Sequence, residues 1–147
     1  MQWSQGSLGR VFVLRLEQGE RVPAVIEDFA REQGIDQALC ALLGGIGGGR
    51  LVVGPADGEA RPVEPLFHPI QAVQEAAALG TLFPDSQGVP RLHMHAALGR
   101  GGGATVGCLR PGVEVWQVAE VVILELKGLA MSRRLDADTG FELLSAD

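Results

Sequence analysis

Clusters of glycine set between apolar segments constrain the fold of this chain more than any other feature. Residues 44–49 read GGIGGG and residues 101–103 are three more glycines, out of 21 in a chain of 147 residues. Dense apolar segments flank both clusters, which is not the composition of a disordered, low-complexity region. Glycine at such places indicates tight turns or a close approach of one backbone to another.

One segment predicts an amphipathic helix. Its apolar residues recur at the i, i+3, i+4, i+7 and i+8 spacing that brings them to one helical face. These residues are Val22, Val25, Ile26, Phe29 and Ala30. Pro23 suits the first turn of this helix and Gly34 suits its C-terminal end, so both boundaries are marked.

Most of the remaining chain predicts strands, because its apolar residues alternate or form short continuous runs. The predicted strands are residues 11–16, 38–43, 50–53, 92–98, 104–109 and 113–126, the last of them long or bent. The glycines around Gly101 join two of these strands into a hairpin. A final hairpin is expected over residues 133–144, with Asp138, Thr139 and Gly140 at its tip.

Two segments complete the expected architecture. Residues 55–65 contain three prolines and predict a loop. Residues 70–82 are compatible with either a helix or a strand, because QAVQEAAAL has helical propensity. We therefore expect a single α+β domain over residues 1–147, in which one main helix packs on a largely antiparallel sheet.

Composition and charge exclude several classes of function. The chain has 12 Lys and Arg against 18 Asp and Glu, a net charge of −6, and Arg133-Arg134 is its only basic doublet. General affinity for nucleic acid needs basic groups that neutralise phosphates, so DNA is a disfavoured partner. No apolar run reaches the roughly 18 residues that span a membrane, and no secretory signal begins the chain. We expect a cytoplasmic protein in which Cys40 and Cys108 are reduced thiols.

His93 and His95 are the residues that most suggest chemistry. The chain has three histidines, and these two flank Met94 in the alternating stretch LHMHAALG. If the stretch is a strand, both imidazoles lie on one face and can chelate a single metal ion. Two ligands fall short of a full site, so other residues must converge on them.

The order of motifs along the chain resembles the plants-and-prokaryotes-conserved (PPC) domain. The motifs are VFVLRLEQGE, a helix ending in EQGI, LLGGIGGGRLVVG, LHMHAALG and VGCLRPGVEVWQVAEVVILEL, and they cover about residues 11–126. The resemblance implies an α/β sandwich that forms homotrimers, with residues 127–147 as a C-terminal hairpin extension. Plants fuse this domain to AT-hook segments that bind DNA, but this chain has no arginine-rich hook.

The resemblance also implies a metal site formed by His93, His95 and Cys108. Cys108 stands where family members often have a histidine, and the alanine-rich residues 70–83 stand where they usually have a strand ending in Ser-Gly. Imidazole and thiolate ligands suit Zn²⁺ or another transition metal. Three protein ligands leave a fourth position for water or substrate.

The register of the hairpin decides whether Cys108 joins the histidines. If Leu98 pairs with Ala104, then Cys108 lies opposite Met94, on the strand face that does not carry the two histidines. A register shifted by one residue brings Cys108 opposite one of the histidines and onto their face. A bulge at the glycines could produce that shift, so both registers stay open.

Simpler interpretations stand beside the metal site. His93 and His95 could be polar strand residues that form hydrogen bonds at a subunit interface, and Cys108 could be a small buried apolar residue. Glu120 lies in an apolar strand and needs a partner there. It could accept a hydrogen bond from an imidazole, act as a general base, or pair with Arg50 or Arg110 across an interface.

Residues 44–49 do not match the known phosphate-binding glycine motifs. The Gly-x-Gly-x-x-Gly spacing that starts at Gly45 would need glycine at Arg50, and no Gly-Lys-Ser/Thr follows. We interpret the segment as a turn that brings strands together. Arg50 itself remains a candidate ligand for an anion.

These observations predict a small PPC-like protein, a homotrimer, that binds a metal ion or small ligand at the His-x-His site near a subunit boundary. The first alternative is a DNA-associated regulator, as in the plant relatives. The second is a metal-dependent hydrolase or lyase that uses zinc-bound water with Glu120 as general base.

Overall fold

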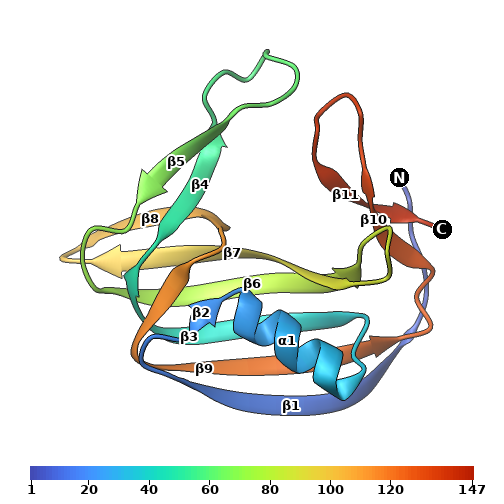
Figure 1. Ribbon diagram of the computed structural model, residues 1–147, viewed down its shortest axis with the longest axis horizontal. Coiled ribbons are helices and arrows are strands. Elements are labelled where there is room, and N and C mark those ends of the chain that lie inside the picture. Colours follow the sequence, from blue (N-terminus) through green and yellow to red (C-terminus); the bar gives the residue numbers. More distant parts are fainter.

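A large antiparallel sheet and a single helix form the structure, a computed structural model that describes all of residues 1–147 (Figure 1). The helix α1 is Ala24–Gln33. The strands are β1 Ser7–Glu17, β2 Arg21–Val22, β3 Ala38–Gly48, β4 Arg50–Pro55, β5 Pro65–Pro69, β6 Gln74–Pro84, β7 Pro90–Arg100, β8 Gly103–Leu109, β9 Val113–Lys127, β10 Met131–Leu135 and β11 Glu142–Ala146. Every strand pair is antiparallel, which confirms the predicted α+β class.

The main sheet has nine strands, in the order β1-β9-β3-β6-β7-β8-β4-β5, and the short β2 pairs with β9. β10 and β11 form a separate two-stranded sheet, the predicted final hairpin. β9 is long and bent as predicted, because its pairing with β3 shifts register twice and Gln117 has φ of 58°. No helix is long and apolar enough to cross a membrane.

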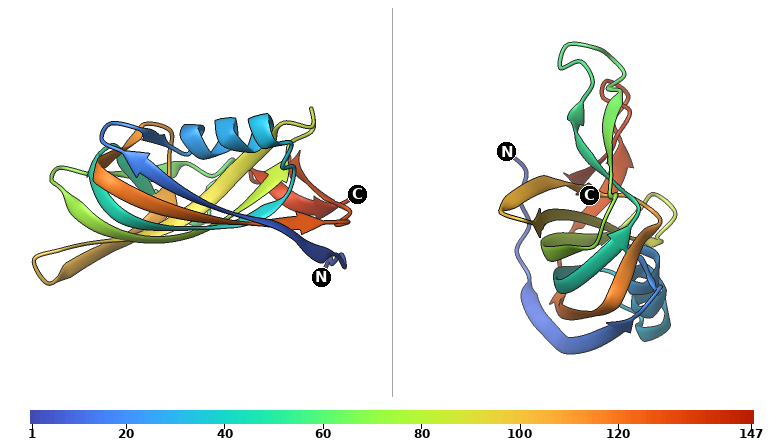
Figure 2. Two further views of the ribbon diagram at one scale, coloured as in Figure 1. Left: turned by 90° about the horizontal axis from the view of Figure 1, so that it is seen from below. Right: turned by 90° about the vertical axis from the view of Figure 1, so that its left-hand side faces the viewer.

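Helix α1 covers one face of the sheet and leaves the other face without a helix (Figure 2). It ends at Gly34, whose left-handed backbone, with φ of 62°, lets its N–H reach the last turn. Ile26 and Ala30 are fully buried and belong to one hydrophobic core with Leu42 and Ile123 of the sheet. The predicted helix and its C-terminal boundary are therefore confirmed, but Val22 lies in β2 rather than on the helix, and Pro23 is the residue that precedes its first turn.

The glycine-rich residues 44–49 belong mainly to strand β3, so their interpretation as a turn is wrong. β3 continues to Gly48, and only Gly49, with φ of 110°, turns the chain into β4. A Cβ on Gly44 would lie 2.5 Å from the Cα of Ala119, and one on Gly45 would lie 2.7 Å from the carbonyl oxygen of Trp116. The glycines are needed because the backbone of β9 passes so close to β3.

Residues 70–82, which stayed open between helix and strand, lie largely in strand β6. Ala76 and Ala78 are buried beneath α1, whereas Ala77 and Leu79 between them lie on the opposite face. Pairing with β3 on one side and β7 on the other outweighs the helical propensity of the alanines. β5 is an additional strand, which begins at Pro65, where the predicted loop ends.

Two hairpins, β4–β5 and β10–β11, project from the sheet on the same side (Figure 1). Their tips touch, since the N–H of Val63 donates to the carbonyl oxygen of Thr139 at 3.3 Å. Arg61 and Asp138 form an ion pair across the same contact, with 3.6 Å between Nε and Oδ2. The tips of the two projecting hairpins therefore support one another.

The sheet face opposite α1 is unusually apolar. Directly paired strand residues share a face, so the pairing register assigns its members. They are Val11, Val13, Leu43, Leu79, Val106 and Val122, whose exposed fractions run from 37% to 73%. We call these six residues the open apolar face.

Candidate metal centre

His93 and His95 lie on β7, on the sheet face opposite α1. Met94 between them points into the core and is only 1% exposed, whereas both histidines are exposed. β7 alternates because its even-numbered residues from Met94 onward fill the space beneath α1. The prediction that both imidazoles lie on one strand face is confirmed.

The β7–β8 register brings Cys108 to the histidines. Gly99 pairs with Ala104 and His95 pairs with Cys108, which is the shifted register rather than the pairing of Leu98 with Ala104. No bulge is needed. A two-residue loop of Gly101 and Gly102, with φ of 60° and 85°, closes the hairpin, and these positive angles suit the preferred hairpin turn.

The three candidate ligands converge in space. The Nε2 atoms of His93 and His95 are 3.1 Å apart, and their ring centroids are 5.0 Å apart. One ligand atom from each of His93, His95 and Cys108 lies within 4.8 Å of the others. Tetrahedral Zn²⁺ holds nitrogen and sulfur ligands about 3.3–3.8 Å from one another. The separations here, 3.1 Å between the two Nε2 atoms and at most 4.8 Å among the three ligand atoms, lie around that range.

Burial and neighbouring positive charges set the protonation of the site. Burial lowers the pKa of His93, and the charges of Arg133, His95 and Arg110 lower that pKa further. Burial raises the pKa of Cys108, an effect that Arg110 and Arg133 partly offset. Near neutral pH His93 is therefore in its neutral, ligand-competent form, whereas a metal ion must displace a proton from the thiol.

The other predicted site residues lie farther out. Arg50 is exposed on β4, with its guanidinium carbon 4.1 Å from the ring centroid of Phe67. Glu120 is exposed on β9, and β3 and β6 separate it from β7, a distance of about 14 Å at the usual strand spacing. It forms no ion pair with Arg50 or Arg110 within the chain. Its assignment as a general base remains a prediction that requires a second subunit.

Two hollows in the surface lie away from the three ligands. One, of about 580 Å³, lies between the end of α1 and the end of β9 and is lined by Gln37, Glu125 and Lys127 among others. The other, of about 340 Å³, lies beside α1 and β1. The ligand cluster instead occupies the open side of the sheet, next to the open apolar face.

Arg110 and Arg133 are site residues whose role the sequence did not reveal. Arg133 follows the candidate ligands by 25 or more positions in the chain. The doublet that it forms with Arg134 looks like an ordinary pair of exposed basic residues. The only signal in the sequence was that Arg133 begins the predicted C-terminal hairpin. In the structure both arginines act electrostatically on His93 and Cys108.

Solved structures share this fold over nearly the whole chain. A metal-containing protein from Archaeoglobus fulgidus is 28% identical, with a TM-score of 0.83 over 97% of this chain and 98% of that one. A plant- and prokaryote-conserved (PPC) protein from Pyrococcus horikoshii is 25% identical, with a TM-score of 0.80 over 99% of both chains.

A third structure, from Bacteroides thetaiotaomicron, is provisionally described as DNA-binding. It is 19% identical, with a TM-score of 0.77 over 97% of this chain and 96% of that one, and shows the fold alone. A search of curated proteins found no match. The family model of the Plants and Prokaryotes Conserved (PCC) domain matches residues 3–127. The chain therefore belongs to this family, whose members are also called PPC proteins.

Proposed function

We propose that this protein binds a transition-metal ion, for which zinc fits best, through His93, His95 and Cys108. The observation that carries the proposal is the convergence of the three ligand atoms within 4.8 Å. Two imidazoles and one thiolate form a set that Zn²⁺ uses in proteins, and Mg²⁺ or Ca²⁺ would prefer oxygen ligands. The metal-containing relative from Archaeoglobus fulgidus, with the same fold, supports the proposal.

Three protein ligands leave one coordination position for water or a small ligand. His93 and His95 would hold the ion through neutral nitrogens, and Cys108 would supply the one negative charge. The ion itself would act as a Lewis acid toward whatever occupies the fourth position. On this basis we describe the protein as a metal-dependent small-ligand binder.

We also propose that the protein self-associates, as a homotrimer, through the open apolar face. Successive cross-strand pairs link Cys108 to His95, His95 to Leu79 and, through β3, Leu79 to Val122. These side chains therefore form one row across the face. Exposed apolar patches of this kind mark interaction surfaces on soluble proteins. A second copy seated there would bring the metal centre to a subunit boundary.

DNA association remains an alternative, and the net charge of −6 weighs against it. A hydrolase or lyase activity would also use the metal centre. It would need Glu120 from a neighbouring subunit, because within one chain this residue is separated from β7 by two strands.

Metal analysis of protein purified without a histidine tag tests the proposal. We expect about one zinc ion per chain after loading and dialysis, and loss of that metal in His93→Ala and His95→Ala. His68→Ala is the matched control, because His68 is the third histidine and lies exposed on β5 opposite Leu51. Wild-type protein that retains no transition metal, or full metal content in His93→Ala, would contradict the proposal.

A further inference from the structure

Arg133 is a buried arginine with no carboxylate partner. It is 5% exposed, and its side chain belongs to none of the ion pairs in the chain. Its Nη2 donates to the carbonyl oxygen and hydroxyl of Thr81 at 2.9 and 3.2 Å, and its Nε donates to the carbonyl oxygen of Arg91 at 3.4 Å. All these acceptors are neutral, although a buried positive charge is normally paired.

Arg133 is held by strands β6 and β7, of which β7 carries two of the proposed metal ligands. Thr81 on β6 is the direct cross-strand partner of His93 on β7. Side chains of such partners have Cβ atoms about 4.5–5.5 Å apart on the same face. The guanidinium group bound to Thr81 therefore lies next to the His93 imidazole.

One end of the Arg133 guanidinium group is free. Nη1 makes no hydrogen bond within the chain. No fully buried side-chain nitrogen or oxygen lacks a partner, so Nη1 keeps contact with solvent. Burial lowers the pKa of Arg133, and the charges of Glu142, Cys108 and Glu27 partly offset this without forming an ion pair with it.

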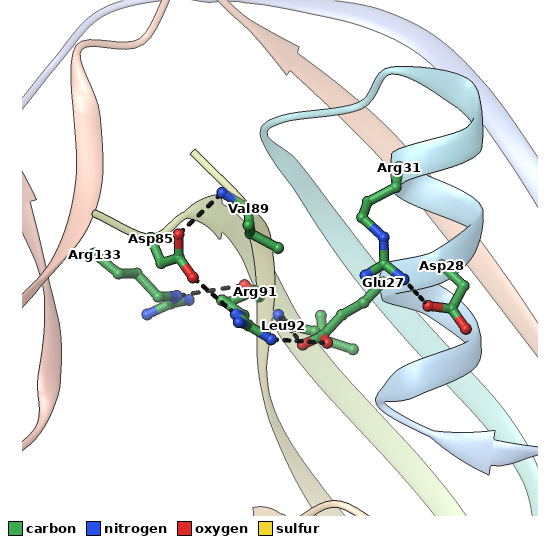
Figure 3. Close-up of polar contacts among 8 residues, drawn as sticks. All are labelled: Glu27, Asp28, Arg31, Asp85, Val89, Arg91, Leu92 and Arg133. Atoms are coloured by element: carbon green, nitrogen blue, oxygen red, sulfur yellow. Dashed lines mark hydrogen bonds and ion pairs between the residues drawn. The ribbon is translucent and has the colours of Figure 1, made fainter. Parts of the chain in front are cut away.

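Neighbouring Arg91 shows the contrast. It is only two residues from His93, but its side chain is committed elsewhere (Figure 3). Its Nε lies 3.0 Å from Oδ2 of Asp85, and its Nη1 lies 3.9 Å from Oε2 of Glu27. Arg91 is neutralised by two carboxylates, whereas Arg133 beside it is neutralised by none.

Arg110 is a second unpaired arginine at the centre. It directly follows β8, two residues after Cys108, and is half-buried without an ion pair or a side-chain hydrogen bond. Its place two residues after Cys108 brings it to the end of the strand that carries the thiol, and its charge lowers the pKa of both His93 and Cys108. Arg50 adds a third unpaired guanidinium at the rim, two residues before Val52, the cross-strand partner of Cys108.

This concentration of unpaired charge is unusual for the chain. Seven of its 12 basic side chains form ion pairs with carboxylates. Arg133 and Arg110, on β10 and just after β8, are two of the five basic side chains that form no ion pair, and both lie near the ligand cluster. Arg50, on β4, lies farther out.

We propose that the metal centre receives a small oxyanion, the carboxylate or phosphate group of a small molecule, held between the ion and the guanidinium groups of Arg133 and Arg110. The inference rests on the proposed metal function, because the anion would occupy the fourth coordination position. Zn²⁺ with one thiolate keeps a net charge of +1, and the two arginines raise it to +3. Guanidinium groups bind carboxylate and phosphate oxygens in a planar, two-pronged geometry.

Titration of cobalt-loaded protein with inorganic phosphate and, separately, with acetate tests the proposal. Co²⁺ reports ligand exchange at its open position through its visible absorption, and metal content is measured on every sample. We expect a saturable spectral change in wild-type protein. Arg110→Gln and Arg133→Lys should weaken it about tenfold or more, the cost of losing a charged hydrogen bond. Arg21→Gln is the matched control, because Arg21 is exposed on β2 and also lacks an ion pair.

Titration with imidazole, a neutral ligand, distinguishes loss of the oxyanion site from loss of the metal site. All variants should bind imidazole at the metal as wild type does, because no arginine is needed. Arg110→Gln keeps the test valid if Arg133→Lys fails to fold, since the side chain of Arg110 makes no hydrogen bonds. Failure of wild-type protein to load metal overturns the proposed function. Two results would overturn the oxyanion site alone. One is metal-loaded wild-type protein whose spectrum does not change with either anion, and the other is equal anion affinity in wild-type protein and the arginine variants.

Discussion

The Nε2 atoms of His93 and His95 lie 3.1 Å apart on the surface of one strand. Two protonated imidazoles could not approach so closely without repulsion. The lowered pKa of His93, caused first by burial and then by Arg133, His95 and Arg110, favours the neutral form. The free protein therefore presents His93 in its neutral form beside the His95 ring and the Cys108 thiol. This is the state that a metal ion requires of its histidine ligands.

Replacement of Cys108 distinguishes a ligand from a buried apolar residue. Cys108→Ser should lower zinc affinity by more than about tenfold, a loss that removal of an outer-sphere partner alone can already cause. Cys108→His should retain the metal, because imidazole is an equivalent ligand and the same position directly faces His95. Isothermal titration with Zn²⁺ measures both affinities.

Cobalt spectroscopy supplies the control for that prediction. A sulfur-to-cobalt charge-transfer band should appear in wild-type protein and in Cys40→Ala, since Cys40 is buried in the core beneath α1 and away from the site face. The band should be absent from Cys108→His. A sulfur band that persists in Cys108→His would assign the thiolate ligand to Cys40 and contradict the site.

Charge placed on the open apolar face should break self-association. Leu79 is 59% exposed and lies on β6 directly opposite His95. Leu79→Glu should reduce the molar mass measured by light scattering to that of one chain, because a carboxylate cannot be buried there unpaired. The circular dichroism spectrum should be unchanged.

Leu66→Glu is the control for this substitution. Leu66 is 49% exposed but lies on the β4–β5 hairpin, outside the open apolar face. It should leave the molar mass unaltered. Equal molar masses for wild-type protein and Leu79→Glu would show that this face does not hold subunits together.

The contact between Arg10 and Glu125 should make stability depend on pH in the acid range. Nη2 of Arg10 lies 2.8 Å from Oε1 of Glu125, and its Nε and backbone N each lie 2.9 Å from Oε2. The hydrogen bonds from Arg10 hold the pKa of Glu125 at about 2, below its ordinary value of 4.5. The contribution of the carboxylate to stability is therefore complete above pH 4.5 and disappears as the pH falls toward 2.

Thermal melts between pH 6 and pH 2.5 test this contact. Glu125→Gln should lower Tm at pH 6 but should show a smaller further loss than wild type as the pH falls. Glu75→Gln, an exposed glutamate on β6 without an ion pair, should follow the wild-type curve. Parallel Tm profiles for Glu125→Gln and wild type would refute the predicted linkage.

The close pairing of β4 with β8 should depend on the absence of a side chain at Gly107. A Cβ there would lie 2.6 Å from the carbonyl oxygen of Val52 and 3.1 Å from the Cβ of Leu51. Gly107→Ala should lower the free energy of unfolding by about 1–3 kcal/mol, the usual cost of overpacking. Because Cys108 is the next residue, zinc affinity should fall as well.

Gly99→Ala is the control within the same hairpin. Its Cβ would find no atom closer than 3.8 Å, an ordinary van der Waals distance. Urea unfolding should therefore give nearly the wild-type free energy of unfolding. Similar losses in both variants would mean that any glycine of this hairpin, rather than the contact between β4 and β8, limits stability.

Patterns within short stretches of sequence determined the local elements of this protein. The apolar spacing from Val22 to Ala30 and the glycine at position 34 were sufficient to predict α1 and its end, because helix periodicity and capping are local. The alternation around His93 and His95 likewise predicted that both imidazoles share a face. Family resemblance then identified Cys108 as the third candidate ligand.

Tertiary structure decided what depends on neighbours distant in the chain. Residues 70–82 became a strand because β3 and β7 pair with them on both sides, against the helical propensity of the alanines. Gly44 and Gly45 became strand residues because β6 and β9 pair with them, and they must be glycines because the backbone of β9 passes too close for a Cβ. Such effects require knowing which strands are adjacent, and no local pattern contains that information.

The candidate site divides in the same way. The sequence supplied its residue types, but the loop angles at Gly101 and Gly102 decided the register that brings Cys108 to His95. Arg133 joins the centre through a hydrogen bond to Thr81, 52 residues earlier in the chain. Ligand chemistry is a property of individual residues, whereas the charge around a ligand is a property of the folded surface, and only the fold reveals it.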